Sequence, residues 1–407
     1  MKLFQWISKL LGYLIYLPNI MPLTALFKSE IFPWAFLYSL RKDTRLTTGY
    51  AVFLIYILIS TLLGVSGLSS ILGISRAFFA LVNASLIFFL LIHIKKEEYT
   101  FLCKAFEFVF AANVVLCLVQ FLGLFPVFLE PVFEIFIDRF TAGIFGGGRG
   151  VAGLFAEPSY ASLSIHYYFA FFMLNRRVNP KSLFGAVLIM GMILFDLFII
   201  RSVTGLVMIF IYFVSLQKRA DILRGGAVLL ALVVGLIYFI GPTKNAPRSI
   251  STAYDFFKYG EYKDPQPWLL EQSGFRFVSV WAAYQYGLKH PLGSGIGNWG
   301  PASIEAMDDV GVNASAMSFF ATAAGSEYMG VRPTSYAAGL MLETGVVGLF
   351  LFFIAFGPFV VRKKLYEDVH TRSLSLFFLF NIFALGSIGD PIPFIFFAFA
   401  YRNTNNE

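Results

Sequence analysis

The sequence predicts an all-α, polytopic membrane protein with about ten to twelve transmembrane helices. Of its 407 residues, 58% are hydrophobic, 18% are aromatic and only 14% are charged, whereas soluble globular chains carry roughly 25% charged residues. Several apolar runs are long enough to cross the hydrocarbon core of a bilayer as helices. The alternation of polar and apolar residues that a membrane β-barrel requires does not occur.

Nine apolar stretches have the length of a membrane-spanning helix. Residues 10–40 are also apolar, but Pro18, Pro22 and Pro33 interrupt them, so we expect one or two tilted or re-entrant helices there. A further short apolar piece covers 391–400. The nine stretches are 49–72, 77–94, 101–124, 158–174, 183–200, 203–217, 225–241, 336–361 and 373–389.

The basic residues fall on alternate sides of these predicted helices. One set of short loops holds fifteen Lys and Arg residues, whereas the opposite short loops hold only Arg76, Arg139, Arg149 and Arg201. By the positive-inside rule, the side that is rich in basic residues is cytoplasmic. The N-terminus lacks a small-residue cleavage site, so we expect a retained anchor. The fifteen residues are Arg41, Lys42, Arg45, Lys95, Lys96, Arg176, Arg177, Lys181, Lys218, Arg219, Arg224, Arg362, Lys363, Lys364 and Arg372.

Two segments on the opposite, periplasmic side are long. One is residues 125–157, and the other is residues 242–335, which is too aromatic to be disordered. We expect the second loop to fold on the outer face of a single integral membrane domain that covers 1–407. The net charge of +7 follows from the topology and does not indicate nucleic-acid binding. Cys103 and Cys117 share one apolar stretch, so they predict neither a disulfide nor a metal cluster.

Arginines on the periplasmic side are the first candidates for a functional site. A guanidinium group can donate two parallel hydrogen bonds to phosphate oxygens, so a group of arginines suits a pyrophosphate. For any single arginine the alternatives are lipid-headgroup anchoring and an ion pair. Arg201 lies in a tight turn between apolar runs, and the alternative to a functional role is that its side chain snorkels to the membrane interface. The set is Arg139, Arg149, Arg201, Arg248, Arg276 and Arg332.

The stretch GGGRGVAGLFAEPSY, residues 146–160, joins the first loop to a predicted helix. Its glycines allow positive φ, and their amides can wrap an anion, with a flexible linker as the alternative. Pro158 suits the first helical turn, which places Glu157 at the helix N-terminus, where the dipole favours negative charge. We expect Glu157 to accept a proton or to pair with Arg149, and the alternative is a helix cap.

The second loop ends in the stretch SGFRFVSVWAAYQYGLKHPLGSGIGNWG. It begins as a helix-like segment with Arg276 and ends in a glycine-rich turn with His290 and Asn298. Tyrosine and tryptophan beside polar groups suit sugar stacking and hydroxyl recognition. The alternative for His290, which precedes a proline, is that it only shapes the turn.

The stretch GVRPTSYAAGLMLETGVVGLF follows and runs from Arg332 through Tyr336 into a membrane helix. Glu343 lies inside this apolar helix, and an acidic residue within a membrane helix is a functional candidate. A packing or ion-pair role is the alternative. The sequence has no zinc-ligand spacing, no Walker motif, no GxGxxG and no Ser-His-Asp order.

These stretches together resemble the bacterial O-antigen and exopolysaccharide polymerases of the Wzy type. GRGVAGLFAEPSYAS, which includes Tyr160, is similar to the arginine–glycine–phenylalanine–EPS stretch of that family. The two later stretches resemble the hPlGxGxGn turn and the following helix of the wider polymerase and O-antigen ligase superfamily. Arg139 and Gly150 are separated by ten residues, as are Arg276 and Gly287, which is similar to the RX10G spacing of such polymerases.

The resemblance implies a multispan glycosyltransferase of the lipid-donor (GT-C-like) type in the bacterial inner membrane, with a site that faces the periplasm. It implies transfer of a growing glycan from undecaprenyl pyrophosphate to the non-reducing end of a lipid-linked repeat unit. Arg149, Glu157 and Arg276 carry over as catalytic candidates. The substrate-binding candidates are Arg139, Tyr160, Arg201, His290, Asn298, Arg332, Tyr336 and Glu343.

We expect no metal cofactor, because arginines can neutralise the leaving pyrophosphate. The expected partners are the undecaprenyl-pyrophosphate-linked oligosaccharide, membrane lipids and a chain-length regulator. Three alternatives stay open: an O-antigen ligase, which transfers glycan to the lipid A core, a transporter of lipid-linked oligosaccharides, and a non-catalytic assembly subunit. Ligases place a histidine just before the helix at 336, where this chain has Arg332-Pro-Thr-Ser, and transporters show repeated halves, so we favour the polymerase.

Overall fold

The computed structural model describes residues 2–21, 32–40, 44–65, 71–144, 150–216, 275–312, 330 and 332–405, together with the single residues 235, 238, 254 and 258. Within these ranges the chain is helical, and its one extended pairing is an isolated antiparallel bridge between Ile20 and Ile137. The all-α class is thus confirmed for this part of the chain. Arg149, Arg248, most of the predicted span 225–241 and most of the second loop lie outside the described residues.

The helices follow the predicted apolar stretches closely. Two further helices, α13 (Phe275–Lys289) and α14 (Trp299–Asp309), lie in the predicted second loop. Four shorter helical pieces are η1 (Val127–Leu129), α6 (Glu130–Glu134), the π-helical turn η2 (Asp196–Ile200) and η4 (Lys363–Tyr366). The helices of the bundle are α1 (Lys2–Leu14), α2 (Pro33–Ser39), α3 (Thr48–Val65), α4 (Ile71–Leu91), α5 (Lys96–Phe121), α7 (Pro158–Asn175), α8 (Leu183–Phe195), α9 (Val203–Leu216), α16 (Tyr336–Val360), α17 (Val369–Phe383) and α18 (Ile392–Asn403).

Four helical segments in the described part are long and apolar enough to cross a membrane, and they identify a helical membrane protein. Two further apolar helices, Thr48–Leu62 and Val203–Leu216, are shorter. The total number of spans and their orientation stay predictions. The four segments are Gly73–Leu91, Lys96–Phe121, Leu183–Ile200 and Tyr336–Val360.

Two prolines of the N-terminal region, Pro18 and Pro33, interrupt the helices as predicted, and Pro22 lies outside the described residues. Helix α1 ends at Leu14, Pro18 lies in a non-helical stretch, and Pro33 takes the first position of α2. The Tyr16 hydroxyl in this stretch donates a hydrogen bond of 3.1 Å to the carbonyl of Leu102 in α5. The region therefore forms two short helices rather than one continuous span.

Helix α18 forms the centre of the bundle. All its residues from Ile392 to Ala400 are buried, and it packs against α4, α7 and α17. Aromatic rings dominate these contacts, for example Phe378 and Phe397, which stack with centroids 4.3 Å apart. Because α18 is enclosed by other helices, its apolar sequence reflects burial in protein rather than contact with lipid.

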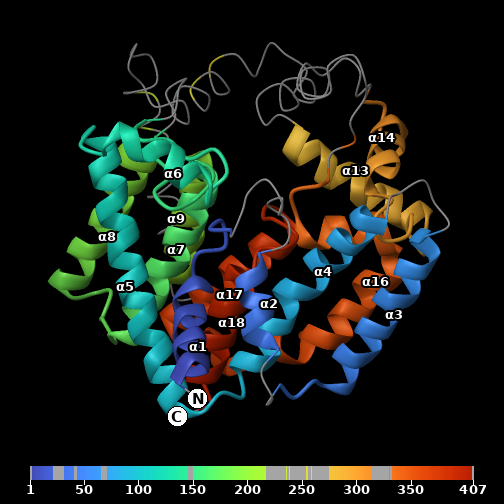
Figure 1. Cartoon of the computed structure of the whole chain (residues 1–407), viewed down its shortest axis with the longest axis horizontal. Coiled ribbons are helices and arrows are strands. Elements are labelled where there is room, and N and C mark those ends of the chain that lie inside the picture. Colours follow the sequence, from blue (N-terminus) through green and yellow to red (C-terminus); the bar gives the residue numbers. More distant parts are fainter. Residues whose placement is uncertain are drawn as a thin grey trace.

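The helices form two groups on either side of α17 and α18 (Figure 1). One group contains α5, α7, α8 and α9, and the other contains α3, α4 and α16. Helices α6, α13 and α14 lie at one end of the bundle, and both chain termini lie at the opposite end. We call the end at which α5 ends and α7 begins the site end.

Candidate functional site

A carboxylate between two arginines forms the centre of the candidate site. Glu157 Oε1 lies 2.5 Å from Nη1 of Arg139, and Glu157 Oε2 lies 3.0 Å from Nη2 of Arg276. The side chain of Glu157 is 15% exposed, compared with 36% for Arg276 and 67% for Arg139. The cluster therefore opens to solvent on the Arg139 side. We call these three residues the arginine–glutamate bridge.

Glu157 occupies the N-cap position of α7, and Pro158 takes the first helical position as predicted. The Glu157 carbonyl accepts the amide of Ala161, but its side chain makes no capping hydrogen bond. The Ser159 hydroxyl donates to Glu157 Oε2 over 3.4 Å. The carboxylate is thus held at the positive end of the α7 dipole, with its oxygens directed at the arginines.

Two polar side chains of α5 fix the segment that leads into α7. Asn113 Oδ1 accepts the amide of Leu154 at 2.9 Å, and Gln120 Oε1 accepts the amide of Gly153 at 2.8 Å. Gln120 also donates from Nε2 to the carbonyl of Thr141 at 2.8 Å. Gln120 therefore ties together both sides of the loop that carries the arginine–glutamate bridge.

Gly150 and Gly153 allow this segment to approach its neighbours closely. A Cβ at Gly150 would overlap the backbone carbonyls of Ile199 and Ile200 at the end of η2, and the amide of Val151 donates to Ile199 at 3.1 Å. Gly153 has a φ of +59°, which favours glycine. Gly150, the glycine that ends the RX10G-like spacing, and Gly153 thus serve close backbone packing.

Arg139 is presented by a small apolar cluster at the site end. Phe125, Ile137, Phe140 and Ala142 form its buried part. The bridge between Ile20 and Ile137 joins this cluster to the N-terminal region. Arg139 has a φ of +57°, in the left-handed region that non-glycine residues rarely adopt, and this turn directs its side chain toward Glu157.

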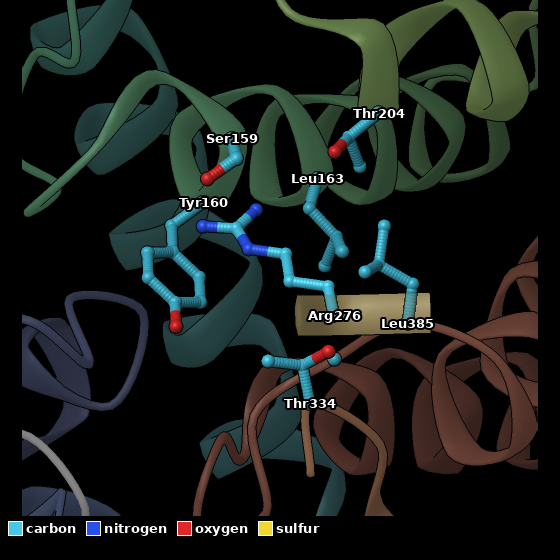
Figure 2. A pocket seen from close by; sticks show the side chains of 8 residues that line it. Ser159, Tyr160, Leu163, Thr204, Arg276, Thr334 and Leu385 are labelled. Atoms are coloured by element: carbon cyan, nitrogen blue, oxygen red, sulfur yellow. The ribbon is translucent and has the colours of Figure 1, made fainter. Parts of the chain in front are cut away.

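Arg276 comes from the second residue of α13, which packs mainly on α16. Gly287 allows this packing, because a Cβ there would press against the carbonyl and side chain of Met341. Figure 2 shows the Arg276 guanidinium reaching toward Ser159 and Tyr160 of α7, with Thr334 on the opposite side. The two helix groups of the bundle therefore meet at Arg276 and Glu157.

Two cavities flank the bridge and share Tyr160. The larger, cavity A, has a volume of about 130 Å³ and is lined by Asn19, Phe32, Asp138, Arg139, Ala156, Glu157, Tyr160 and Ser387. The smaller, cavity B, has a volume of only about 20 Å³ and is lined by Ser159, Tyr160, Leu163, Thr204, Arg276, Thr334, Leu385 and Gly386. Each cavity thus has one arginine of the bridge in its wall. Cavity A adds the hydroxyl groups of Tyr160 and Ser387, and cavity B adds those of Ser159, Tyr160, Thr204 and Thr334 (Figure 2).

Arg332 and Glu343 form a second, buried ion pair. Arg332 Nη2 lies 2.5 Å from Glu343 Oε2, and the side chains are 7% and 0% exposed. Glu343 Oε1 accepts the amide of Gly297 at 3.1 Å. Glu343 therefore forms an ion pair, which the sequence analysis gave as the alternative to a functional role. A role of Glu343 in substrate binding stays a prediction.

The glycine-rich turn inserts into a break in α16. Gly345 has a φ of +65°, which interrupts the helix, and the amides of Ser294 and Gly295 donate to the carbonyls of Leu342 and Glu343. The amide of Val347 donates to the carbonyl of Pro291. Irregular backbone inside a membrane helix needs such hydrogen-bond partners. The glycine-rich turn therefore has a structural role, because it satisfies the backbone of α16 where that helix is interrupted.

Of the other predicted site residues, Tyr160 lies beside the arginine–glutamate bridge in the walls of both cavities, whereas Asn298, His290 and Tyr336 make their hydrogen bonds and ring contacts with other residues. Asn298 donates from Nδ2 to the carbonyl of Ser294 at 2.9 Å. The His290 ring stacks on Tyr286 with centroids 4.2 Å apart. Tyr336 is buried, and its hydroxyl donates to the carbonyl of Leu81 at 2.8 Å.

Arg201 ends the π-helical turn η2 with a φ of +56°. Its Nε donates to the carbonyl of Phe198 at 2.9 Å, and its guanidinium lies 5.7 Å from the ring centroid of Phe121. The tight turn predicted at Arg201 is present. The structure does not bring this side chain to Glu157, and Arg149 lies outside the described residues.

Sequence reasoning missed Asn113, Gln120 and Asp390. Asn113 and Gln120 are buried polar residues within the apolar stretch 101–124, and buried polar side chains in a membrane helix are the signal that could have found them. Asp390 follows the last predicted span and is itself buried, in the loop whose Leu385, Gly386 and Ser387 line the two cavities. The sequence around Asp390, GDPIP, predicts only a turn.

Fold and site together define a helical membrane protein with a charged, recessed site at one end of its bundle. Comparison of the chain with models of known protein families, with curated proteins and with solved structures finds no match. Among the described residues, no group of three or more His, Cys, Asp or Glu side chains is arranged to hold a metal ion. Metal independence stays a prediction.

Proposed function

We propose that this membrane protein is a polysaccharide polymerase of the Wzy type. It would transfer a growing glycan from undecaprenyl pyrophosphate to the non-reducing end of a second lipid-linked repeat unit, at the periplasmic face of the inner membrane. The observation that carries the proposal is the convergence of Arg139, from the turn before α7, and Arg276, from the start of α13, on Glu157 at a cavity. Arginines recognise carboxylates and phosphates with the same geometry.

In this proposal the two arginines bind the diphosphate of the donor. Arg139 is the more exposed and lines cavity A, whereas Arg276 lines cavity B, so a diphosphate beside Glu157 could contact both. Fixed positive groups that face the leaving oxygen stabilise the negative charge that develops on it in the transition state. Serine and tyrosine hydroxyls in both walls, and threonine hydroxyls in the wall of cavity B, suit recognition of sugar hydroxyls.

The transfer step balances without a further reactant. A hydroxyl oxygen of the acceptor sugar forms a bond to the anomeric carbon of the donor, and the bond from that carbon to the diphosphate breaks. The lipid diphosphate leaves with the electron pair, and a protein carboxylate takes the hydroxyl proton. Glu157 serves as an internal counter-anion that holds both guanidinium groups in position before the donor binds.

The test is polymerisation by the purified, lipid-reconstituted protein supplied with a defined lipid-linked repeat unit. A ladder of products supports the proposal. Products that form only after addition of lipid A core would instead identify the ligase. Movement of the lipid-linked sugar across the vesicle membrane without elongation would identify the transporter, and either result would overturn the polymerase assignment.

The chain offers a matched control for the arginines. Arg176 pairs with Glu107 at 2.7 Å with side-chain exposures of 58% and 24%, which resembles the bridge pairs, but it follows the opposite end of α7. We expect Arg139→Ala and Arg276→Ala to lose the ladder and Arg176→Ala to keep it. Arg149→Ala, predicted from the sequence, is expected to behave like Arg276→Ala.

A further inference from the structure

The turn between α1 and α2 reaches cavity A. The carbonyl of Leu17 accepts the amide of Ile20 at 3.1 Å, which closes a β-turn around the two residues between them. The second of these is Asn19, which lines cavity A together with Phe32, the residue before α2. The N-terminal region therefore supplies part of the cavity wall beside the arginine–glutamate bridge.

Main-chain contacts with other parts of the protein hold this turn in place. The carbonyl of Ile20 accepts the indole N–H of Trp34 in α2. The amide of Met21 donates to the carbonyl of Phe136 at 2.7 Å. Non-helical backbone between membrane helices is tolerated where it is buried in protein or lines a cavity. The side chain of Asn19 is therefore not needed to fix the turn.

The Asn19 side chain is buried, yet it makes no hydrogen bond with any residue that the structure describes. The residue is 5% exposed. Asparagine is common in turns because its side chain hydrogen-bonds the nearby backbone, so turn formation does not account for this amide. Asn113 Nδ2 is sealed inside the protein without a partner, whereas neither polar atom of Asn19 is sealed. The amide of Asn19 is therefore open to cavity A.

Cavity A has both charged and neutral polar groups in its wall. The charged groups include Arg139 and Glu157, and the neutral polar groups are those of Asn19, Tyr160 and Ser387. An amide offers two donors and two acceptor lone pairs without a charge, so it matches neighbouring sugar hydroxyls better than a phosphate. The cavity volume of about 130 Å³ is several times the roughly 10–15 Å³ that one water requires, so a larger polar group can enter.

We propose that Asn19 recognises the sugar of the donor. Its amide hydrogen-bonds hydroxyl groups of the sugar next to the diphosphate, while the guanidinium of Arg139 binds the diphosphate itself. This inference rests on the proposed function and assigns the neutral part of the cavity A wall to the glycan. The class of ligand is a lipid-diphosphate-linked sugar, held by its hydroxyls and not only by its phosphates.

The experiment measures the binding of two probes to the purified protein in lipid nanodiscs. One probe is undecaprenyl diphosphate that carries a defined repeat unit, and the other is undecaprenyl diphosphate without sugar. Asn19→Leu should raise the Kd of the first probe by about 10-fold, the effect of losing one or two neutral hydrogen bonds, and leave the Kd of the second unchanged. Arg139→Ala should weaken both probes, because both carry the diphosphate.

Protein stability separates sugar recognition from a structural role. The amide of Asn19 has no hydrogen-bond partner in the described part of the chain, so the thermal midpoint of ligand-free Asn19→Leu should equal the native value, and Asn19→Ala is a second variant in case leucine does not fit. Asn113→Leu should lower the midpoint, because Asn113 Oδ1 accepts the amide of Leu154 at 2.9 Å. Asn175→Leu, at the opposite end of α7, should bind both probes as the native protein does.

The outcomes separate this inference from the proposed function. A loss confined to the sugar-bearing probe, with a native midpoint, supports sugar recognition by Asn19. Equal losses for both probes, no loss for either, or a loss that accompanies a lower midpoint in both Asn19 variants overturns the inference, and the polymerase proposal stands if the wild type elongates. A selective loss in a protein that never elongates would support the inference and overturn the proposed function, and a wild type that binds neither probe would overturn both.

Discussion

The guanidinium of Arg276 donates a hydrogen bond of 3.0 Å to the carboxylate of Glu157 across a separation of 119 residues. This contact joins α13, which packs on α16, to the first turn of α7, which packs on α9 and α17. It therefore connects the two helix groups at the site end. A substrate that competes with Glu157 for Arg276 would act directly on this junction.

Arginine at position 276 should not be replaceable by lysine. A lysine keeps the positive charge but cannot donate two parallel hydrogen bonds from one planar group. We expect Arg276→Lys to lower the elongation rate by about 10²-fold, the cost of losing one positioned donor. The measurement is kcat with the defined lipid-linked repeat, and a lysine variant with native kcat would show that charge alone suffices.

Gln120 should set the position of the loop that carries Arg139 and Glu157. Gln120→Leu removes the partners of the Gly153 amide and the Thr141 carbonyl, and each unsatisfied buried group costs about 1–3 kcal/mol. We expect faster hydrogen exchange in peptides that cover 141–157, with α5 itself unchanged. Val115→Leu, on the exposed face of the same helix, is the control, and equal exchange in both variants would contradict the prediction.

Helix positions could be predicted from the sequence because apolar runs and prolines act locally. Pro158 begins α7 as expected, and Pro33, which was expected to interrupt the apolar stretch 10–40, begins α2. The sequence could not show that α18 is surrounded by protein, since a buried helix and a lipid-facing helix have the same apolar composition. Tertiary packing decides between them, and packing depends on contacts between distant residues.

Gly150 should be intolerant of a side chain. A Cβ there would overlap the backbone carbonyls of Ile199 and Ile200, and overpacking of this kind costs about 1–3 kcal/mol. We expect Gly150→Ala to lower the thermal midpoint in detergent and to reduce elongation. Gly143→Ala is the control, because a Cβ at Gly143 meets no atom within 4 Å, and similar midpoints for the two variants would refute this view of Gly150.

The buried pair of Arg332 and Glu343 should matter for stability. Glu343→Gln removes the negative charge that pairs with the buried Arg332 guanidinium, and breaking a buried ion pair in this way costs about 3–5 kcal/mol. The glutamine amide oxygen can still accept the Gly297 amide. We expect a clear fall in the thermal midpoint, with partial recovery when Arg332→Met is added. Glu305→Gln, at an exposed carboxylate, should have little effect, and a Glu343→Gln midpoint equal to native would contradict the prediction.

The sequence predicted Glu157 and the arginines as site residues, but it did not predict which arginines contact Glu157. Glu157 at the start of α7 followed from Pro158 and from the helix dipole. Its partners did not, because the neighbouring arginine in sequence is Arg149, whereas the described partners are Arg139 and Arg276. The left-handed turn at Arg139 and the docking of α13 on α16 decide which guanidinium groups reach the carboxylate, and neither leaves a local sequence signal.

The site end should face the periplasm if the positive-inside prediction is correct. Asp138 lies at this end with a side chain 53% exposed, whereas Lys181 is an exposed residue in the turn between α7 and α8, at the opposite end. A membrane-impermeant maleimide should label Asp138→Cys in intact spheroplasts and Lys181→Cys only after permeabilisation. The native Cys103 and Cys117 are buried, so the unmodified protein should give no signal. The reverse pattern would place the arginine–glutamate bridge in the cytoplasm, where a polymerase that acts on periplasmic lipid-linked glycans could not work.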